Sequence, residues 1–231
     1  MTLLHHRDRI EGDLVIEVAF TDVSLSLGDA AEDEVRAEAL REVARATGAA
    51  PVLMKQVHGA DVALVDDTPT AVAATGDAMI TGRSGVALLA RAADCVPVLL
   101  ADPRSGWIAA VHAGRPGLAA GVVPAAVAAL RARGARPSVG WVGPHVCGSC
   151  YEVPAAMQDE VAAVVPESRS TTSWDTPGLD LGAGVRAQLA AAGIDDVRVV
   201  EVCTREDGSW PSHRRDGAAA TRFAGVIWSH A

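Results

Sequence analysis

The segment from Ala93 to His112 has the sequence ADCVPVLLADPRSGWIAAVH, in which two apolar runs flank a short polar stretch. Asp-Pro followed by Ser-Gly is typical of a turn. The segment therefore predicts a β-hairpin with strands at residues 96–101 and 107–112. If residues 102–105 form the loop, Ala101 faces Gly106, and Cys95 faces His112 at the open end of the hairpin.

This register would place a sulfur and an imidazole side by side. Directly paired residues have Cβ atoms about 4.5–5.5 Å apart. Zinc lies about 2.3 Å from a thiolate sulfur and about 2.0 Å from an imidazole nitrogen. A buried Cys alone is usually a small hydrophobic residue, but the predicted pairing favours two metal ligands or a Cys–His catalytic pair. The opposite face of the hairpin is apolar and would be a core face: Val96, Val98, Leu100, Trp107, Ala109 and Val111.

The remaining pattern predicts an α+β fold, that is, a mixed α/β protein with a mixed β-sheet core flanked by helices. Consecutive strands argue against a doubly wound βαβ repeat. An Asp29–Glu32 capping signal and Gly48 bound one expected helix. We expect one domain over residues 1–231, with helices at 32–47, about 124–133, 154–165 and 181–192. Further strands are expected at 14–20, 52–57, 61–65, 79–80, 86–91, 139–142 and 197–202.

Composition excludes several classes of function. With 231 residues, 49% of them hydrophobic, the chain can bury a sizeable core. A net charge of −9 argues against non-specific binding to nucleic acid. Without a long apolar run or a signal-peptide pattern, we expect a cytoplasmic protein that does not bind membranes. Four Cys do not form a disulfide framework, so we expect reduced thiols.

Five motifs along the chain, two of them overlapping the hairpin segment, resemble in order those of one protein family. They are KQVHG at 55–59, ADCVPV at 93–98, VHAG at 111–114, GP with CYEV at 143–153, and CT with SHRRDG at 203–217. They resemble the YfiH/YlmD family, which is also described as multicopper polyphenol oxidase (laccase), purine nucleoside phosphorylase YfiH or peptidoglycan editing factor. The resemblance implies a YfiH-like fold.

The resemblance also implies a metal centre of His58, Cys95 and His112, which would be the catalytic residues. The assignment of His58 to this centre rests on the resemblance alone, because the hairpin pattern involves only Cys95 and His112. Zinc is the expected cofactor, although copper could bind in vitro because of its higher intrinsic affinity. Three protein ligands would leave a fourth position for water, as in catalytic zinc sites.

Substrate-binding residues are expected near this centre. Gln56 shares a strand face with His58, Arg115 stands near the place of a family arginine, and Arg215 belongs to a basic tail with Arg214 and Arg222. For an anion, the alternatives are that tail or the Gly114–Gly117 loop, which leads into a helix. The chain has GRPG where the family has GWRG, which leaves the role of Arg115 open.

The function implied is a zinc-dependent purine nucleoside enzyme. It would phosphorolyse adenosine, inosine, guanosine and methylthioadenosine, and it would deaminate adenosine through zinc-activated water. Its partners would be a nucleoside and phosphate; the oligomeric state stays open.

Other functions remain alternatives. One is an amidase that edits a peptidoglycan precursor, a muramyl nucleotide carrying Ser. A second is a non-catalytic zinc or redox module at Cys147 and Cys150, with His145 and Cys203 completing the site. A laccase is disfavoured because the seven His contain no H-x-H pair.

Overall fold

The computed structural model describes residues 3–28, 31–66 and 72–231. The strands in these ranges are β1 (His5–Ile10), β2 (Val15–Phe20), β3 (Ala50–Lys55), β4 (Val62–Leu64), β5 (Val72–Thr75), β6 (Ala78–Thr81), β7 (Val86–Ala92), β8 (Val96–Ala101), β9 (Ile108–Ala113), β10 (Val139–Val142), β11 (Arg169–Thr171), β12 (Pro177–Leu179), β13 (Asp196–Val199) and β14 (Phe223–His230). The helices are α1 (Asp33–Thr47), α2 (Arg115–Ala119), α3 (Val122–Ala132), α4 (Ala155–Val164), α5 (Leu181–Ala191) and α6 (His213–Asp216), with short 3-10 turns η1 (Pro166–Ser168) and η2 (Gly217–Ala219).

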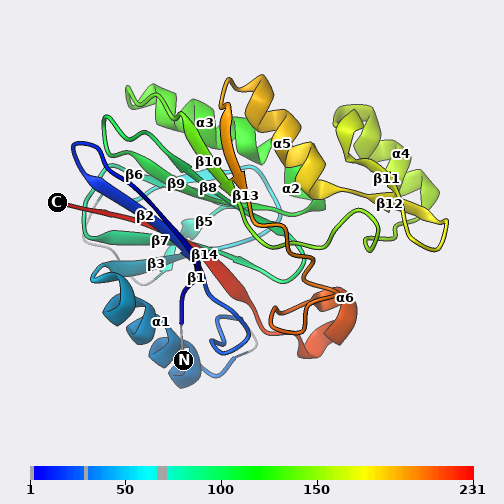
Figure 1. Ribbon diagram of the computed structural model, residues 1–231, viewed down its shortest axis with the longest axis horizontal. Coiled ribbons are helices and arrows are strands. Elements are labelled where there is room, and N and C mark those ends of the chain that lie inside the picture. The colour runs from blue at the N-terminus through cyan, green and yellow to red at the C-terminus, as the bar shows by residue number, and fades with distance from the viewer. Residues whose placement is uncertain (1–2, 29–30, 67–71) are drawn as a thin grey trace.

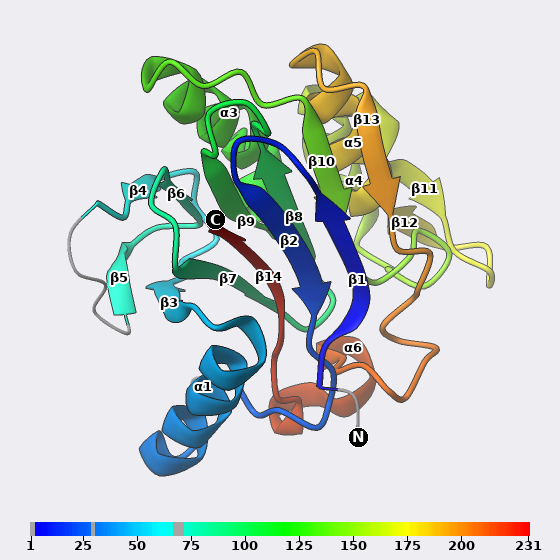
Figure 2. The ribbon, with the colours of Figure 1, turned by 60° about the vertical axis from the view of Figure 1, so that its left-hand side comes forward.

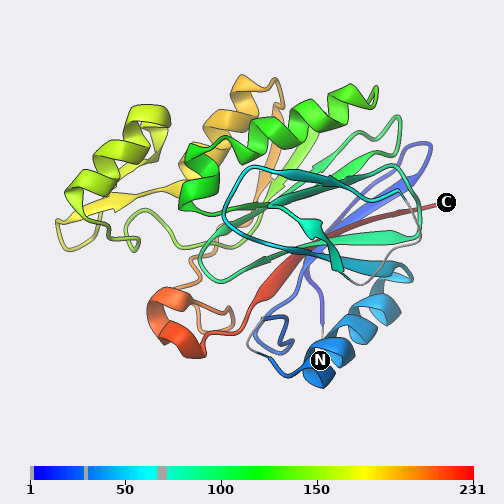
Figure 3. The same ribbon diagram turned by 180° about the vertical axis from the view of Figure 1, so that it is seen from behind.

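Two mixed sheets pack face to face. The first has the strand order β1-β2-β14-β7-β3-β5, and the second has the order β13-β10-β8-β9-β6-β4. Helix α1 lies outside the first sheet, while α3 and α5 lie outside the second (Figure 1). The view from behind shows the same layers (Figure 3). The predicted α+β class with a mixed sheet and flanking helices is therefore confirmed; that the domain is single stays a prediction.

The hairpin strands are buried on both faces, which explains their continuous apolar sequence. In β8, Val98 and Leu100 face the helices of the second sheet, whereas Leu99 and Ala101 face the first sheet. The β1–β2 hairpin lies over β8 and β10 (Figure 2), and the Trp141 indole N–H donates to Asp8 across this interface. The expected core face is confirmed, and the opposite face is a second core.

The predicted helices form with small shifts at their ends. Helix α1 ends at Gly48, whose left-handed conformation (φ 68°) lets its N–H donate to Ala44 O. Its N-cap is Glu32, without a side-chain cap; Asp29, the expected cap, lies outside the described residues. Residues 115–119, expected as a loop, form the short helix α2 ahead of α3.

The predicted register of the hairpin is wrong by two residues. Ala101 pairs with Ile108, and His112 pairs with Pro97 rather than Cys95. The reason is that the turn lies one residue further along the chain, at residues 103–106: Asp102 N–H donates to Trp107 O, and Gly106 N–H donates to Asp102 O. Since side chains alternate with a period of two, the shift leaves Cys95 diagonal to His112 on the same side.

The C-terminal strand is a feature that sequence reasoning missed. Strand β14 lies between β2 and β7, at the centre of the first sheet, although its apolar run could have predicted it. Among the described residues, no helix has the length and hydropathy needed to cross a bilayer.

Candidate functional site

Three side chains from distant parts of the chain meet at one end of the two sheets. His58 follows β3 in a left-handed conformation (φ 61°), Cys95 directly precedes β8, and His112 lies in β9. Their potential ligand atoms all lie within 4.8 Å of one another. Cys95 Sγ is 3.9 Å from His58 Nε2, and the two imidazole centroids are 4.8 Å apart. The structure thus brings together the three residues expected to bind metal.

Asp77 holds two of these residues in place. Its buried carboxylate accepts the backbone N–H groups of Val57, His58 and Gly59 at 3.1, 2.9 and 2.7 Å. The same carboxylate contacts His112 Nδ1 at 2.8 Å. A carboxylate that accepts from one imidazole nitrogen fixes the tautomer and leaves the other nitrogen to ligate metal. Sequence reasoning missed Asp77; the signal was an acidic residue directly before a buried strand.

Burial sets the protonation of the cluster. It lowers the pKa of His112 below its ordinary value, although the hydrogen bond to Asp77 opposes it, so the imidazole is neutral at pH 7. Burial also acts to raise the pKa of Asp77, but the hydrogen bonds from His112 and the backbone outweigh it and lower the net pKa. Burial, aided by the Asp94 carboxylate, raises the pKa of Cys95 to about 12. Without a cation, Cys95 is therefore a protonated thiol.

The donor set and its spacing suit zinc. Tetrahedral bond lengths of about 2.3 Å to sulfur and about 2.0 Å to nitrogen imply an S···N separation of about 3.5 Å. The separation of 3.9 Å between Cys95 and His58 needs an adjustment of a few tenths of an ångström. Gly114 packs tightly beside them, since a Cβ there would lie 2.6 Å from His58 Cδ2 and 3.1 Å from Cys95 Sγ.

The cluster opens into a cavity of about 350 Å³. This volume is within the range of small-molecule sites. Four arginines line it together with the cluster, namely Arg91, Arg115, Arg214 and Arg222. Tyr151 forms another part of the wall, with the Arg214 guanidinium 4.4 Å from its ring centroid. A cavity with this lining can hold an anionic group beside a metal.

The expected substrate-binding residues occupy different places. Arg115 lines the cavity. Gln56 lies outside the cavity lining and exchanges hydrogen bonds with the backbone of Arg91, donating to its O at 2.9 Å and accepting from its N–H at 3.0 Å. Arg215 also lies outside the lining and donates to Thr204 O and Trp210 O, each at 2.8 Å. Its neighbours Arg214 and Arg222, named as part of the basic tail, do line the cavity.

Asp94 links the cluster to the C-terminal loops. Its backbone is left-handed (φ 90°), and its buried carboxylate accepts from Thr204 Oγ1 at 2.7 Å and from Arg214 N–H at 2.6 Å. The side chain therefore positions a neighbouring loop and helix α6, a role that the sequence did not indicate.

Comparison with known families and proteins gives consistent matches over nearly the whole chain. The family described as "Multi-copper polyphenol oxidoreductase laccase" matches residues 8–230. A Streptomyces coelicolor protein named purine nucleoside phosphorylase SCO2081 is 52% identical over 215 residues, covering 88% of this chain and 87% of that protein. A Mycobacterium bovis protein named purine nucleoside phosphorylase BQ2027_MB2173C is 43% identical, covering 89% and 84% of the two chains.

Solved structures share the fold. YlmD from Geobacillus stearothermophilus superposes with a TM-score of 0.85 at 26% identity, covering 94% of this chain and 92% of that one. The hypothetical protein YfiH from Bacillus licheniformis gives a TM-score of 0.85 at 23% identity, covering 93% and 96%.

Proposed function

The chain belongs to the multi-copper polyphenol oxidoreductase laccase family, and from that membership we propose that it is a zinc-dependent purine nucleoside phosphorylase that also deaminates adenosine. The observation that carries the proposal is the meeting of the His58–Cys95–His112 cluster and four arginines in one cavity. The relatives named purine nucleoside phosphorylase, one of them 52% identical, support the same reaction.

Phosphorolysis needs an anion site. A phosphate oxygen forms a bond to C1′ of the ribose while the N-glycosidic bond breaks, and the bonding electron pair leaves with the purine, which takes up a proton. Guanidinium groups bind phosphate oxygens through charge-assisted hydrogen bonds. We assign phosphate binding to Arg115, Arg214 and Arg222, which line the cavity. We prefer this charge-based site to the alternative at Gly114–Gly117, because the helix that starts there has only five residues and Pro116 in its first turn supplies no N–H.

The cluster residues would hold the metal from one side of the cavity. Cys95 and the two imidazoles supply three ligands, and Asp77 keeps His112 oriented. Zinc bound by three protein ligands keeps one open position, where it supplies Lewis-acid chemistry and activates water, which deamination requires. Gln56 and Arg215 would act as positioning residues and not contact the substrate. Gln56 positions the Arg91 backbone, and Arg215 positions the loop that ends at Trp210.

Oxidase chemistry, which the family's description names, has little support in this chain. Only His58 and His112 join a cluster that could bind metal within residues 3–28, 31–66 and 72–231. Cys147, Cys150, Cys203 and Glu206 make a second such cluster, which contains no histidine. Multicopper oxidation relies on several histidine-rich copper sites, so the proposal keeps to nucleoside chemistry.

The proposal is tested with protein purified without metal-affinity steps. Adenosine is incubated with and without phosphate, and the products are separated by chromatography. Phosphorolysis yields adenine and ribose 1-phosphate only with phosphate, whereas deamination yields inosine and ammonia in either case. Both reactions should disappear in Cys95→Ala.

An arginine pair tests the anion site. Arg115→Ala should raise KM for phosphate about 10- to 100-fold, because a hydrogen bond to a charged group contributes about 1.5–3 kcal/mol. Arg104→Ala, an exposed residue of the β8–β9 loop, is the matched control and should leave KM unchanged. No turnover of adenosine, inosine or guanosine by folded, zinc-loaded protein would contradict the proposal and favour the muramyl-nucleotide amidase.

A further inference from the structure

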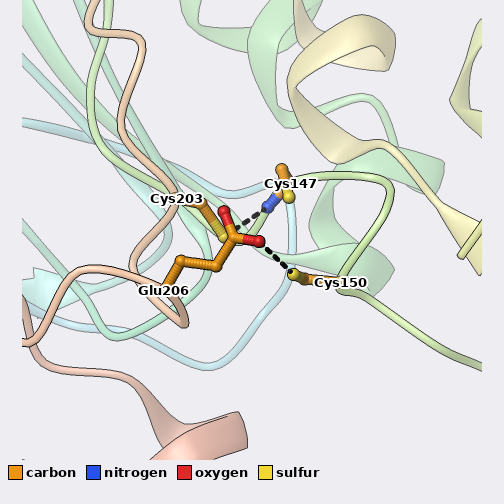
Figure 4. A group of neighbouring side chains, drawn as sticks. All are labelled: Cys147, Cys150, Cys203 and Glu206. Atoms are coloured by element: carbon orange, nitrogen blue, oxygen red, sulfur yellow. Dashed lines mark hydrogen bonds between the residues drawn. The ribbon is translucent and has the colours of Figure 1, made fainter. Parts of the chain in front are cut away.

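A second group of metal-binding side chains lies apart from the cavity. Cys147 and Cys150 come from the loop after β10, and Cys203 and Glu206 come from the loop after β13. Their potential ligand atoms all lie within 4.8 Å of one another, and all three cysteines are free thiols. Figure 4 shows the four side chains converging from the two loops. The sequence indicated Cys147, Cys150 and Cys203 as candidates but named His145 as the fourth ligand.

His145 is not part of this group. Its Nδ1 contacts Gly143 O at 2.8 Å, and its Nε2 lies so close to Gly182 that a Cβ there would approach to 2.2 Å. The ring is therefore fixed against α5. Glu206 takes the fourth position because it lies one turn after Cys203, where Glu206 N–H donates to Cys203 O at 3.2 Å.

The spacing matches tetrahedral zinc. Bond lengths of about 2.3 Å to sulfur and about 2.0 Å to a carboxylate oxygen imply an S···O separation of about 3.5 Å and an S···S separation of about 3.8 Å. Cys150 Sγ is 3.4 Å from Glu206 Oε1. The Cys147-Gly148-Ser149-Cys150 turn is closed by Cys150 N–H donating to Cys147 O at 3.0 Å, which keeps two thiols on one side.

Neighbouring groups suit a negatively charged centre. Cys147 N–H donates to Cys203 Sγ at 3.4 Å, the kind of bond that stabilises a coordinated thiolate. Arg205 and Arg215 line a surface pocket that is also lined by Cys150 and Glu206. Three thiolates and one carboxylate bound to Zn²⁺ would carry a net charge of −2. Arg205 can offset part of this charge, whereas the Arg215 guanidinium is already paired with Asp216 at 2.8 Å.

We propose that Cys147, Cys150, Cys203 and Glu206 form a second, structural zinc site. Four protein ligands leave no open position, which distinguishes it from the three-ligand centre in the cavity. Glu206 is exposed, so an ion can enter from the surface.

The site would brace one wall of the cavity. Tyr151 of that wall directly follows Cys150, and Thr204, which donates to Asp94, directly follows Cys203. A metal joining the two loops fixes both neighbours at once. Loss of the metal should therefore loosen Tyr151 and Arg214 without removing a catalytic ligand.

The first test measures the number of zinc ions per chain in zinc-saturated protein, by elemental mass spectrometry. The wild-type chain should hold two zinc ions, His58→Ala/His112→Ala one, and Cys147→Ser/Cys150→Ser one. Glu206→Ala should lower the zinc affinity of the second site by more than about 100-fold, because it removes a ligand rather than a group that only orients one. Glu201→Ala, an exposed acidic residue of the same loop, is the matched control and should bind as wild type does.

A second measurement needs no variant. Alkylation of the wild-type cysteines, followed by peptide mass spectrometry, should show Cys147, Cys150 and Cys203 protected by zinc and exposed by a chelator. A zinc count that does not fall in Cys147→Ser/Cys150→Ser, alkylation indifferent to zinc, or a Cys147–Cys150 disulfide in the purified protein would each overturn the proposal. None of these results depends on nucleoside turnover.

Discussion

At the scale of single residues, the candidate site depends on groups that are not among the proposed metal ligands or substrate-binding residues. Asp77 is buried, accepts three backbone N–H groups around His58, and holds His112 Nδ1. Asp77 thus couples the loop after β3 to strand β9, whose His112 lies 35 residues after Asp77 in the chain. Gly114 contributes by having no side chain where His58 and Cys95 pack.

Asp77→Asn should weaken metal binding while leaving the ligands in the chain. The amide keeps the size of the carboxylate but loses its charge and one acceptor, so His112 is held less firmly. We expect zinc affinity to fall about 10- to 100-fold, measured by competition with a chromogenic chelator. Asp61→Asn changes an exposed neighbour and is the control. Equal zinc affinity in the two variants would contradict the orienting role of Asp77.

Gly114→Ala should displace the ligands sterically. The added Cβ would lie 2.6 Å from His58 Cδ2, a distance that requires the ring to move. We expect loss of zinc from the cavity site and of nucleoside turnover, with the circular dichroism spectrum unchanged. Gly208→Ala, where a Cβ meets nothing within 4 Å, should behave as wild type. A fully active Gly114→Ala enzyme would rule out this close packing.

At the scale of elements, the β8–β9 hairpin places Cys95 and His112, and its turn is organised by Asp102. The buried carboxylate accepts from Arg104 N–H at 3.0 Å, Ser105 Oγ at 2.5 Å and Arg136 N–H at 2.7 Å. Burial acts to raise its pKa, but these hydrogen bonds outweigh it and lower the net pKa. The turn is thus joined to the segment before β10 through an ionised group.

Asp102→Asn should destabilise the protein in a pH-dependent way. Because the folded-state pKa is lowered, the stability that Asp102 contributes is present above the unfolded pKa of about 3.9. It is lost as pH falls through the folded-state value. We expect a loss of about 1–3 kcal/mol in the free energy of unfolding at pH 7, measured by urea denaturation.

The difference between wild type and Asp102→Asn should shrink when the same denaturation is run below pH 3.9. Asp13→Asn, an exposed change, should alter stability little at either pH. A destabilisation that does not change with pH would show that the charge of Asp102 is not what holds the turn.

At the scale of the whole molecule, stability comes from three stacked apolar layers. One lies between the sheets, and one lies beneath the helices on each outer side. Leu99 of β8 is fully buried in the central layer. The same strand directly follows Cys95, so this packing fixes both the fold and the position of the candidate site.

Leu99→Ala should therefore be severely destabilising. Removing a large side chain from a close-packed core costs about 2–5 kcal/mol, because a cavity remains. Guanidinium denaturation should show this loss, whereas Val164→Ala, on a residue that is 63% exposed, should change stability by about 0.5 kcal/mol or less. A small effect at Leu99 would mean that the two sheets can collapse onto the void.

The sequence by itself determined the elements and the local part of the site. Period and turn residues located β8, β10, α1, α3 and α5 within a few residues. The alternation of side chains along the hairpin strands predicted that Cys95 and His112 lie on the same face. That prediction held despite the register error, because the register was shifted by two residues. Such features depend on neighbours along the chain, so propensity and pattern suffice to predict them.

Only the tertiary structure decided which distant residues meet. It brought His58 and Asp77 to the hairpin, put Arg91 and Arg222 into the cavity, and placed Glu206 beside Cys150. It also showed that Gln56 is hydrogen-bonded to the Arg91 backbone rather than facing the cavity. The physical reason is that sheet pairing and side-chain packing arise from contacts far apart in sequence, about which local periodicity carries no information.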